Sequence, residues 1–122
     1  MSTPLDTALA VLAALDRGDP DAAIQLLAED VRFTFGNNPP TTGRAGFEAA
    51  AKGMFEAIES GKHNVTQRWQ VDTDTAVVLA DVDYKRRDGR ELTLPACSVF
   101  RVRDGLVTDY QIYMDVNPVL AP

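Results

Sequence analysis

The chain has 122 residues, of which 45% are apolar and 25% are charged, as is typical of an ordinary single-domain globular protein. Its net charge is −6 and its largest basic cluster is Lys85-Arg86-Arg87, so the positive surface that a nucleic-acid-binding protein needs is missing. No apolar run approaches the roughly 20 residues of a membrane-spanning helix, and we therefore expect no nucleic-acid partner and no membrane partner.

Two short helices are predicted at the start of the chain. Thr3 can cap the first helix, with Pro4 at its first position and Asp6 three residues beyond the cap. Leucines then recur at helical spacing up to position 15, and Gly18 ends the helix. Asp19-Pro20 repeats the start signal, which predicts a second, shorter helix that ends before position 29.

A strand and a third helix are predicted next. The alternating segment from Val31 to Phe35 indicates a strand, and the Gly-Asn-Asn-Pro-Pro run after it has the composition of a loop. The third helix should extend from about Gly43 to Ser60, with Gly61 well placed to end it. Its buried stripe consists of Phe47, Ala51, Met54, Phe55 and Ile58.

The second half of the chain reads as strands. From Lys62 onward the apolar residues recur with period two, and turn signals at Asp72-Thr73-Asp74, Asp88-Gly89 and Asp104-Gly105 separate four such runs. This pattern predicts a four-stranded antiparallel meander. Because helices and strands are segregated along the chain, the expected fold class is α+β, with helices covering one face of a curved sheet.

Several segments also follow one another in a characteristic order along nearly the whole chain. They are Asp16-Arg17-Gly18-Asp19, Leu26 to Val31, Pro39-Pro40 with Gly43-Arg44, Ser98-Val99-Phe100-Arg101, Asp104-Gly105 and Tyr113-Met114-Asp115. In these segments the chain resembles the nuclear transport factor 2-like superfamily, which includes ketosteroid isomerases, limonene epoxide hydrolase and the SnoaL-type polyketide cyclases. The resemblance implies one domain over residues 1–122, in which three helices pack on the concave face of a curved, mainly antiparallel sheet and enclose a cone-shaped pocket. It also implies a homodimer, but no single activity, because this fold hosts enzymes, binders and assembly modules.

The catalytic sets of these relatives are largely missing from this chain. In an alignment based on this resemblance, the catalytic positions of the ketosteroid isomerases fall on Val11, Ser98 and Phe35. Those of limonene epoxide hydrolase fall on Asp81, Asp83 and Ile112. Only Asp83 keeps the residue type that the relatives use. Dehydratases of this fold rely on paired histidines, whereas this chain has one, His63, which we interpret as a surface or strand-start residue. A lone histidine cannot hold a metal, so we expect neither a metal nor a cofactor.

Asp81 and Asp83 are the candidate catalytic residues. They lie two positions apart in an apolar strand, and residues i and i+2 of a strand share a face. If that face lines the pocket, the two carboxylates would share a proton near neutral pH and titrate as a coupled unit. Such a pair would supply one general base and one donor for proton transfer next to a carbonyl.

The turn at Asp88-Gly89 decides which face this strand presents to the pocket. A two-residue turn directs both carboxylates inward, onto the face of Ala96, whereas a three-residue turn with a bulge places Val82 and Tyr84 there instead. The apolar alternation of the strand favours the three-residue turn, but the resemblance favours the two-residue turn. We expect the carboxylates to point inward.

The expected function is the binding of a small, largely apolar molecule in the pocket, with possible aspartate acid/base chemistry of the isomerase or cyclase type. The alternatives are a ligand-binding protein without chemistry and a dimerising interaction module, and the homodimer is expected to form through the outer face of the sheet. The predicted ligand-binding residues are Phe33, Phe35, Phe55, Leu94, Ala96, Ser98, Tyr110, Ile112 and Met114. A single cysteine and an N-terminus without signal-peptide features predict a cytoplasmic location.

Overall fold

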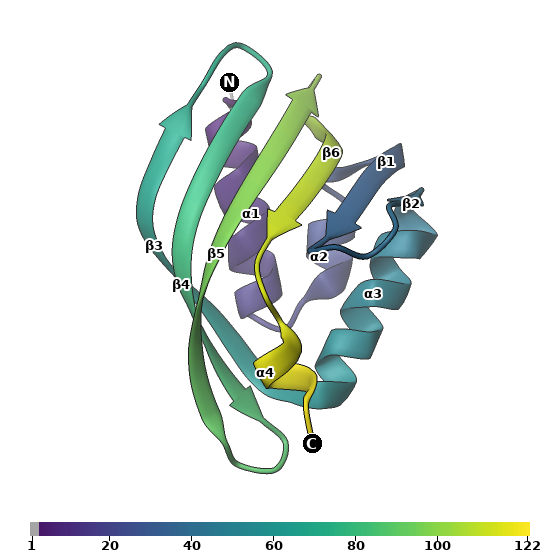
Figure 1. Cartoon of the computed structure of the whole chain (residues 1–122). Coiled ribbons are helices and arrows are strands. Elements are labelled where there is room, and N and C mark those ends of the chain that lie inside the picture. The colour runs from purple at the N-terminus through teal and green to yellow at the C-terminus, as the bar shows by residue number, and fades with distance from the viewer. Residues whose placement is uncertain (1–2) are drawn as a thin grey trace.

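The computed structural model describes residues 3–122, which form a curved six-stranded sheet packed against helices on one face (Figure 1). The helices are α1 (Pro4–Asp16), α2 (Pro20–Ile24), α3 (Arg44–Ala57) and α4 (Asn117–Leu120). The strands are β1 (Leu27–Phe35), β2 (Thr41–Thr42), β3 (Ile58–Gln70), β4 (Thr75–Arg86), β5 (Glu91–Arg103) and β6 (Leu106–Tyr113). The α+β fold class and the four-stranded meander, here β3 to β6, are confirmed.

The sheet has the strand order β2-β1-β6-β5-β4-β3. Neighbouring strands in this order pair antiparallel, except that β1 and β6 run parallel. Figure 1 shows α1, α2 and α3 on the same side of the sheet, with α4 beside the C-terminal end of α3. The core and the cavity described below therefore lie between these helices and the inner face of the sheet.

The first helix begins where the sequence predicts. The Thr3 hydroxyl accepts the Asp6 backbone N–H at 3.1 Å, and the Asp6 carboxylate accepts the Thr3 N–H at 3.0 Å, which completes a capping box. Gly18 follows the helix with a φ of 69°, and Asp19 caps α2 by accepting the Ala22 N–H at 3.1 Å. These caps hold α1 over the sheet with Ala8, Val11 and Leu12 buried.

The predicted end of the third helix was wrong. The helix ends at Ala57, and Ile58 is already extended, with φ −119° and ψ 147°. Ile58 is the first residue of β3, pairs with Arg86 of β4 and is only 3% exposed. Strand pairing therefore provides partners for the backbone hydrogen-bonding groups here while the side chain stays buried. Gly61 consequently lies inside β3 and does not end the helix.

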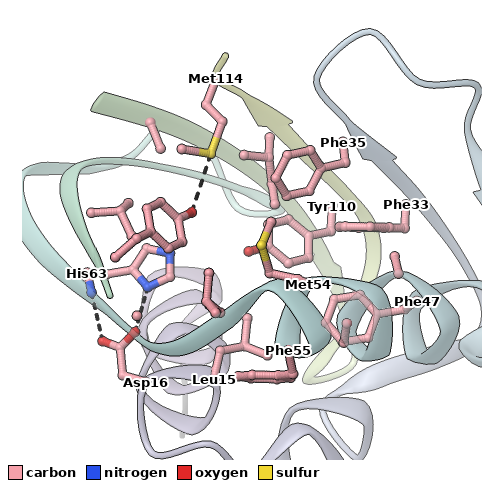
Figure 2. A pocket seen from close by; sticks show the side chains of 18 residues that line it. Leu15, Asp16, Phe33, Phe35, Phe47, Met54, Phe55, His63, Tyr110 and Met114 are labelled. Carbon is pink, nitrogen blue, oxygen red and sulfur yellow. Dashed lines mark hydrogen bonds and ion pairs between the residues drawn. The ribbon is translucent and has the colours of Figure 1, made fainter. Parts of the chain in front are cut away.

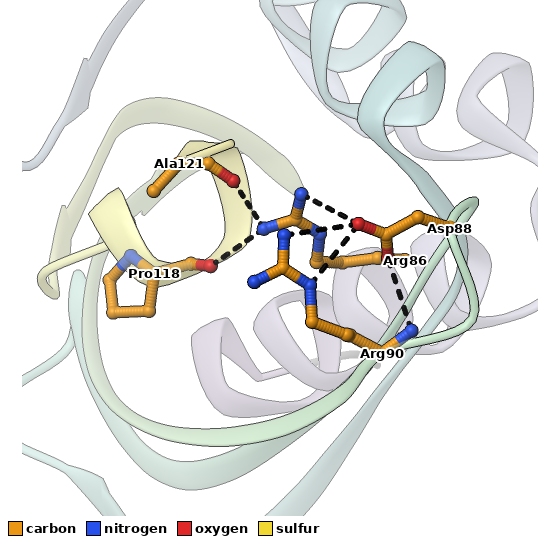
Figure 3. A network of polar contacts seen from close by, with 5 residues as sticks. All are labelled: Arg86, Asp88, Arg90, Pro118 and Ala121. Carbon is orange, nitrogen blue, oxygen red and sulfur yellow. Dashed lines mark hydrogen bonds and ion pairs between the residues drawn. The ribbon is translucent and has the colours of Figure 1, made fainter.

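The C-terminal segment packs against the body of the fold through Arg86 (Figure 3). The Arg86 guanidinium is largely buried, donates to the carbonyls of Pro118 (3.2 Å) and Ala121, and forms a 2.9 Å ion pair with Asp88. Val119 is 1% exposed and belongs to a core cluster with residues of α3 and β4. Of the helices between residues 3 and 122, none has the length and apolar character needed to cross a membrane.

Candidate functional site

A cavity of about 90 Å³ lies between the inner face of the sheet and helices α1 and α3 (Figure 2). Its wall is apolar and rich in phenylalanine and methionine, apart from four polar side chains. These are Asp16, His63, Tyr84 and Tyr110. A volume of 90 Å³ is smaller than the roughly 150 Å³ that accommodates a benzene molecule in an engineered protein cavity.

Seven of the nine predicted ligand-binding residues lie on this cavity wall. They are Phe33, Phe35, Phe55, Ala96, Tyr110, Ile112 and Met114. The other two, Leu94 and Ser98, do not line it. Leu94 packs at the edge of the core cluster that contains Val82, and Ser98 is buried beside Tyr110 with 3% of its surface exposed.

The expected inward orientation of Asp81 and Asp83 was wrong. Arg86 N donates to the Arg90 carbonyl at 2.8 Å, which leaves three residues in the turn, and Gly89 has a φ of 92°. This three-residue turn pairs Val82 with Leu94, so Val82 and Tyr84 face the cavity. Both aspartates are exposed on the outer face of the sheet.

Asp83 is held on the outer face by hydrogen bonds from Thr93 Oγ1 at 2.6 Å and Asn64 Nδ2 at 2.8 Å, which lower the pKa of its carboxyl group. A carboxylate in this position is ionised at neutral pH and does not share a proton with Asp81. The physical reason for the observed orientation is desolvation, because two buried carboxylates would cost far more than the burial of Val82 and Tyr84. The apolar alternation of the strand already indicated this arrangement.

The cavity instead contains a carboxylate–imidazole pair formed by Asp16 and His63. Asp16 is the last residue of α1, and His63 lies in β3 opposite Val82, so its side chain falls on the inner face. Asp16 Oδ1 is 2.7 Å from His63 Nδ1, and Asp16 Oδ2 accepts the His63 backbone N–H at 3.0 Å. Two contacts from one carboxylate fix both the backbone and the ring of His63.

The pair determines the tautomer of neutral His63. An ionised carboxylate only accepts hydrogen bonds, so Nδ1 must carry the hydrogen that Asp16 accepts. Nε2 is then the basic nitrogen, and it forms no hydrogen bond with residues 3–122. The side chains of His63 and Asp16 are 16% and 24% exposed, so the pair is largely shielded from water. Figure 2 shows the two side chains facing each other at the cavity wall.

Tyr84 and Tyr110 are the other two polar residues of the wall. Tyr84 donates to Met114 Sδ at 3.6 Å, a weak acceptor, and burial raises the pKa of its phenol to about 12. Tyr110 is 1% exposed, and its hydroxyl has no hydrogen-bond partner among the described residues. Burial raises the pKa of Tyr110 as well, so both phenols stay protonated at neutral pH.

Sequence reasoning missed Asp16, His63 and Tyr84 as a group. Asp16 and His63 lie 47 positions apart in the sequence. Because the strand was predicted to start only after Gly61, the sequence did not show which face of the sheet the His63 side chain is on. The one available signal was the alternation that places Val82 on the inner face, because His63 is its cross-strand partner. Within residues 3–122, no cluster of three or more His, Cys, Asp or Glu side chains is arranged to bind a metal ion.

Comparison with known proteins agrees with this architecture. A family model described as the SnoaL-like domain matches residues 8–110. An NTF2-like protein from Burkholderia pseudomallei superposes with a TM-score of 0.89 over 100% of both chains, at 20% sequence identity. A Catenulispora acidiphila protein with a ketosteroid isomerase-like fold, in complex with trimethylamine, has a TM-score of 0.84 over 98% of this chain and 92% of its own, at 22% identity.

A third similar structure is an LEH-like epoxide hydrolase from M. tuberculosis, with a TM-score of 0.80, 18% identity and coverage of 96% of this chain and 86% of its own. At these identities the likeness concerns the fold alone. A search of curated proteins found no match to the chain.

Proposed function

Since the chain belongs to the SnoaL-like domain family, we propose that it holds a small, largely apolar molecule in the cavity and that His63, oriented by Asp16, moves a proton on that molecule. The observation that carries this proposal is the 2.7 Å contact between Asp16 and His63 at the wall of an otherwise apolar cavity. Family membership by itself supports no particular reaction, because folds of this kind host many activities.

The proposed chemistry is general acid/base catalysis next to a carbonyl group. His63 Nε2 removes a hydrogen as a proton from the carbon beside the carbonyl, the electron pair of the broken C–H bond forms the enolate, and the negative charge resides on oxygen. The same nitrogen then returns the proton to carbon. Asp16 holds the ring and stabilises the imidazolium between these two steps, so an isomerase or cyclase type of reaction fits the site.

The binding part of the proposal is supported by the apolar wall of the cavity. Pockets for small molecules are lined by apolar and aromatic side chains with a few polar groups in fixed positions, as here. A protein of this fold, from Catenulispora acidiphila, has been determined in complex with trimethylamine, a small molecule.

Hydrogen–deuterium exchange of cyclopentanone in D₂O, followed by NMR, tests the proposal without knowledge of the natural substrate. The wild type should accelerate exchange of the hydrogens beside the carbonyl. His63→Gln should lower the protein-catalysed exchange rate by roughly 100-fold or more, the usual contribution of a general base. Asp16→Asn should also lower this rate, because the imidazole ring would lose the contact that orients it. Exchange at the buffer rate with wild-type protein would refute the proposed chemistry.

The matched control is Asp83→Asn, combined with Asp81→Asn. Both carboxylates lie on the outer face, so the exchange rate should equal that of the wild type. If the double variant loses exchange while His63→Gln keeps it, the assignment of the base to His63 is wrong.

We also propose that two copies of the chain associate through the outer face of the sheet. Cross-strand pairs place Val77, Leu79, Cys97 and Val99 side by side at the centre of that face. They are only half-buried in the single chain, and Trp69 and Tyr113 beside them are 44% and 53% exposed. A continuous apolar area on a sheet face is typical of a protein interface.

A further inference from the structure

The C-terminal segment, residues 115–122, packs beside the cavity through one buried side chain. Val119 is 1% exposed, whereas its neighbour Leu120 is 53% exposed. Figure 1 shows α4, the helix that contains Val119, next to the end of α3. The core cluster that contains Val119 shares four buried residues with the cavity wall, which are Ile58, Val82, Tyr84 and Ala96. Val119 therefore fills space that adjoins the cavity.

Few hydrogen bonds hold this segment on the fold. Within residues 3–122, the bonds that join it to the remaining chain come from the Arg86 guanidinium, which donates to the carbonyls of Pro118, at 3.2 Å, and Ala121 (Figure 3). Its other hydrogen bonds are internal, such as the 2.9 Å bond from the Val119 N–H to the Val116 carbonyl. Detachment of the segment therefore breaks two hydrogen bonds and uncovers one buried side chain, as expected of a region that opens locally.

Arg86 keeps a partner when the segment detaches. Its guanidinium lies 2.9 Å from the carboxylate of Asp88, which belongs to the turn between β4 and β5 and not to the C-terminal segment. A largely buried guanidinium without a partner would be strongly unfavourable, and this ion pair compensates its charge in both positions of the segment. The fold thus supports an attached and a detached arrangement.

The cavity is small for the proposed function while the segment is attached. Its volume of about 90 Å³ lies below the roughly 150 Å³ of a cavity that accommodates benzene. Detachment exposes the inner face of the sheet around Val82 and Ala96, which already belong to the cavity wall. The surface that becomes available is apolar, like the rest of that wall.

Resting on the proposed function, we infer that Val119 limits the size of the ligand and that detachment of the C-terminal segment admits a bicyclic carbonyl compound. Arg86 holds the segment in the attached position. A large ligand binds only the detached form, so its apparent affinity is reduced by the fraction of molecules in that form. A change that raises this fraction tightens the binding of large ligands without altering the cavity itself.

The test compares decalone, a bicyclic ketone, with cyclopentanone, and dissociation constants are measured by NMR titration. Arg86→Lys keeps the positive charge beside Asp88 but replaces the planar group that reaches both carbonyls with a single ammonium. This variant should bind decalone about tenfold more tightly than the wild type does, through a tenfold larger detached fraction. Cyclopentanone binding should change by less than about twofold. An equal gain for both ketones would overturn the role of Val119 in size selection.

Val119→Ala changes the same contact from the side of the segment and should also tighten decalone binding by about tenfold. Leu120→Ala is the matched control, because it shortens an exposed side chain in the same segment and should leave both dissociation constants at their wild-type values.

Amide hydrogen exchange of the wild type tests detachment directly. The Val119 N–H should exchange on the order of 100-fold faster than amides at the centre of β4 and β5, and decalone should accelerate it further. Protection equal to that of the central strands, or an exchange rate that decalone does not change, would overturn the inference.

The outcomes separate this inference from the proposed function. If neither Arg86→Lys nor Val119→Ala alters decalone binding while His63-dependent exchange of cyclopentanone persists, the proposed function stands and the inference is wrong. If no variant binds either ketone, both are wrong.

Discussion

At the scale of single residues, the position of Asp16 is unusual for a carboxylate. The C-terminal end of a helix carries partial negative charge, which disfavours an acidic residue in the last turn. Asp16 is the last residue of α1 and compensates by accepting two hydrogen bonds from His63. The negative end of the helix therefore favours a hydrogen-bond donor next to Asp16. The imidazole of His63, from β3, is that donor at the cavity wall.

The buried phenol of Tyr84 predicts a loss of stability at high pH. Burial raises its pKa to about 12, whereas a tyrosine in an unfolded chain ionises near pH 10. The unfolded state releases its proton first, so the stability contributed by the neutral phenol is complete below pH 10 and is lost as the pH rises to 12. We expect Tyr84 to account for a fall of roughly 1.4 kcal/mol per pH unit in the free energy of unfolding across this interval.

Urea unfolding at several pH values measures this effect. Tyr84→Phe should show a shallower decline between pH 10 and 12 than the wild type, with the remaining slope carried in part by Tyr110, whose pKa is also raised by burial. Equal slopes for wild type and Tyr84→Phe would show that the Tyr84 phenol is not buried as a neutral group.

At the scale of elements, the turn between β4 and β5 decides which side chains reach the cavity. With three residues in the turn, Val82 and Tyr84 face inward, and with two residues the aspartates would do so. Gly89 permits the longer turn because its φ of 92° is a conformation that other residues rarely adopt. The backbone conformation of Gly89 is thus linked to which side chains of β4 line the cavity.

Gly89→Ala should destabilise the protein by about 1 kcal/mol, through backbone strain alone, because no atom lies within 4 Å of the added Cβ position. Gly53→Ala is the matched control. Gly53 lies inside α3 with equally open surroundings, so this substitution should stabilise the protein by roughly 0.5 to 1 kcal/mol. Both changes in the free energy of unfolding are measured from the urea midpoints, provided that the dependence of this free energy on urea concentration stays the same. A stabilising Gly89→Ala would contradict the three-residue turn.

Elements with local signals could be predicted well from the sequence. The Thr3 capping box, the Asp19 cap and the turn glycines are determined by side chains a few residues away, and the structure reproduces them. The boundary between α3 and β3 could not be predicted in this way. Ile58 suits the apolar stripe of a helix as well as a buried strand, and only its pairing with β4 decides between the two.

At the scale of the whole molecule, the outer face of the sheet predicts the oligomeric state. Leu79→Arg places a charge at the centre of the proposed interface and should weaken dimerisation by more than 100-fold, because the charge would be buried without a partner. Sedimentation should then show single chains, with an unchanged circular dichroism spectrum. Ala49→Arg, on the exposed surface of α3, is the control, and a monomeric wild type would refute the proposed dimer.

The sequence by itself determined the fold class, the meander and the helix caps, because periodicity and capping are local properties of the chain. The pocket lined by residues of β1 and β6 followed from the resemblance to a known family. Only the tertiary structure decided which polar side chains line this pocket. Strand parity changes with a single residue in a turn, and this moved Asp81 and Asp83 to the outer face. The contact between Asp16 and His63 joins a helix end to a strand 47 residues away, a distance over which no local pattern carries information.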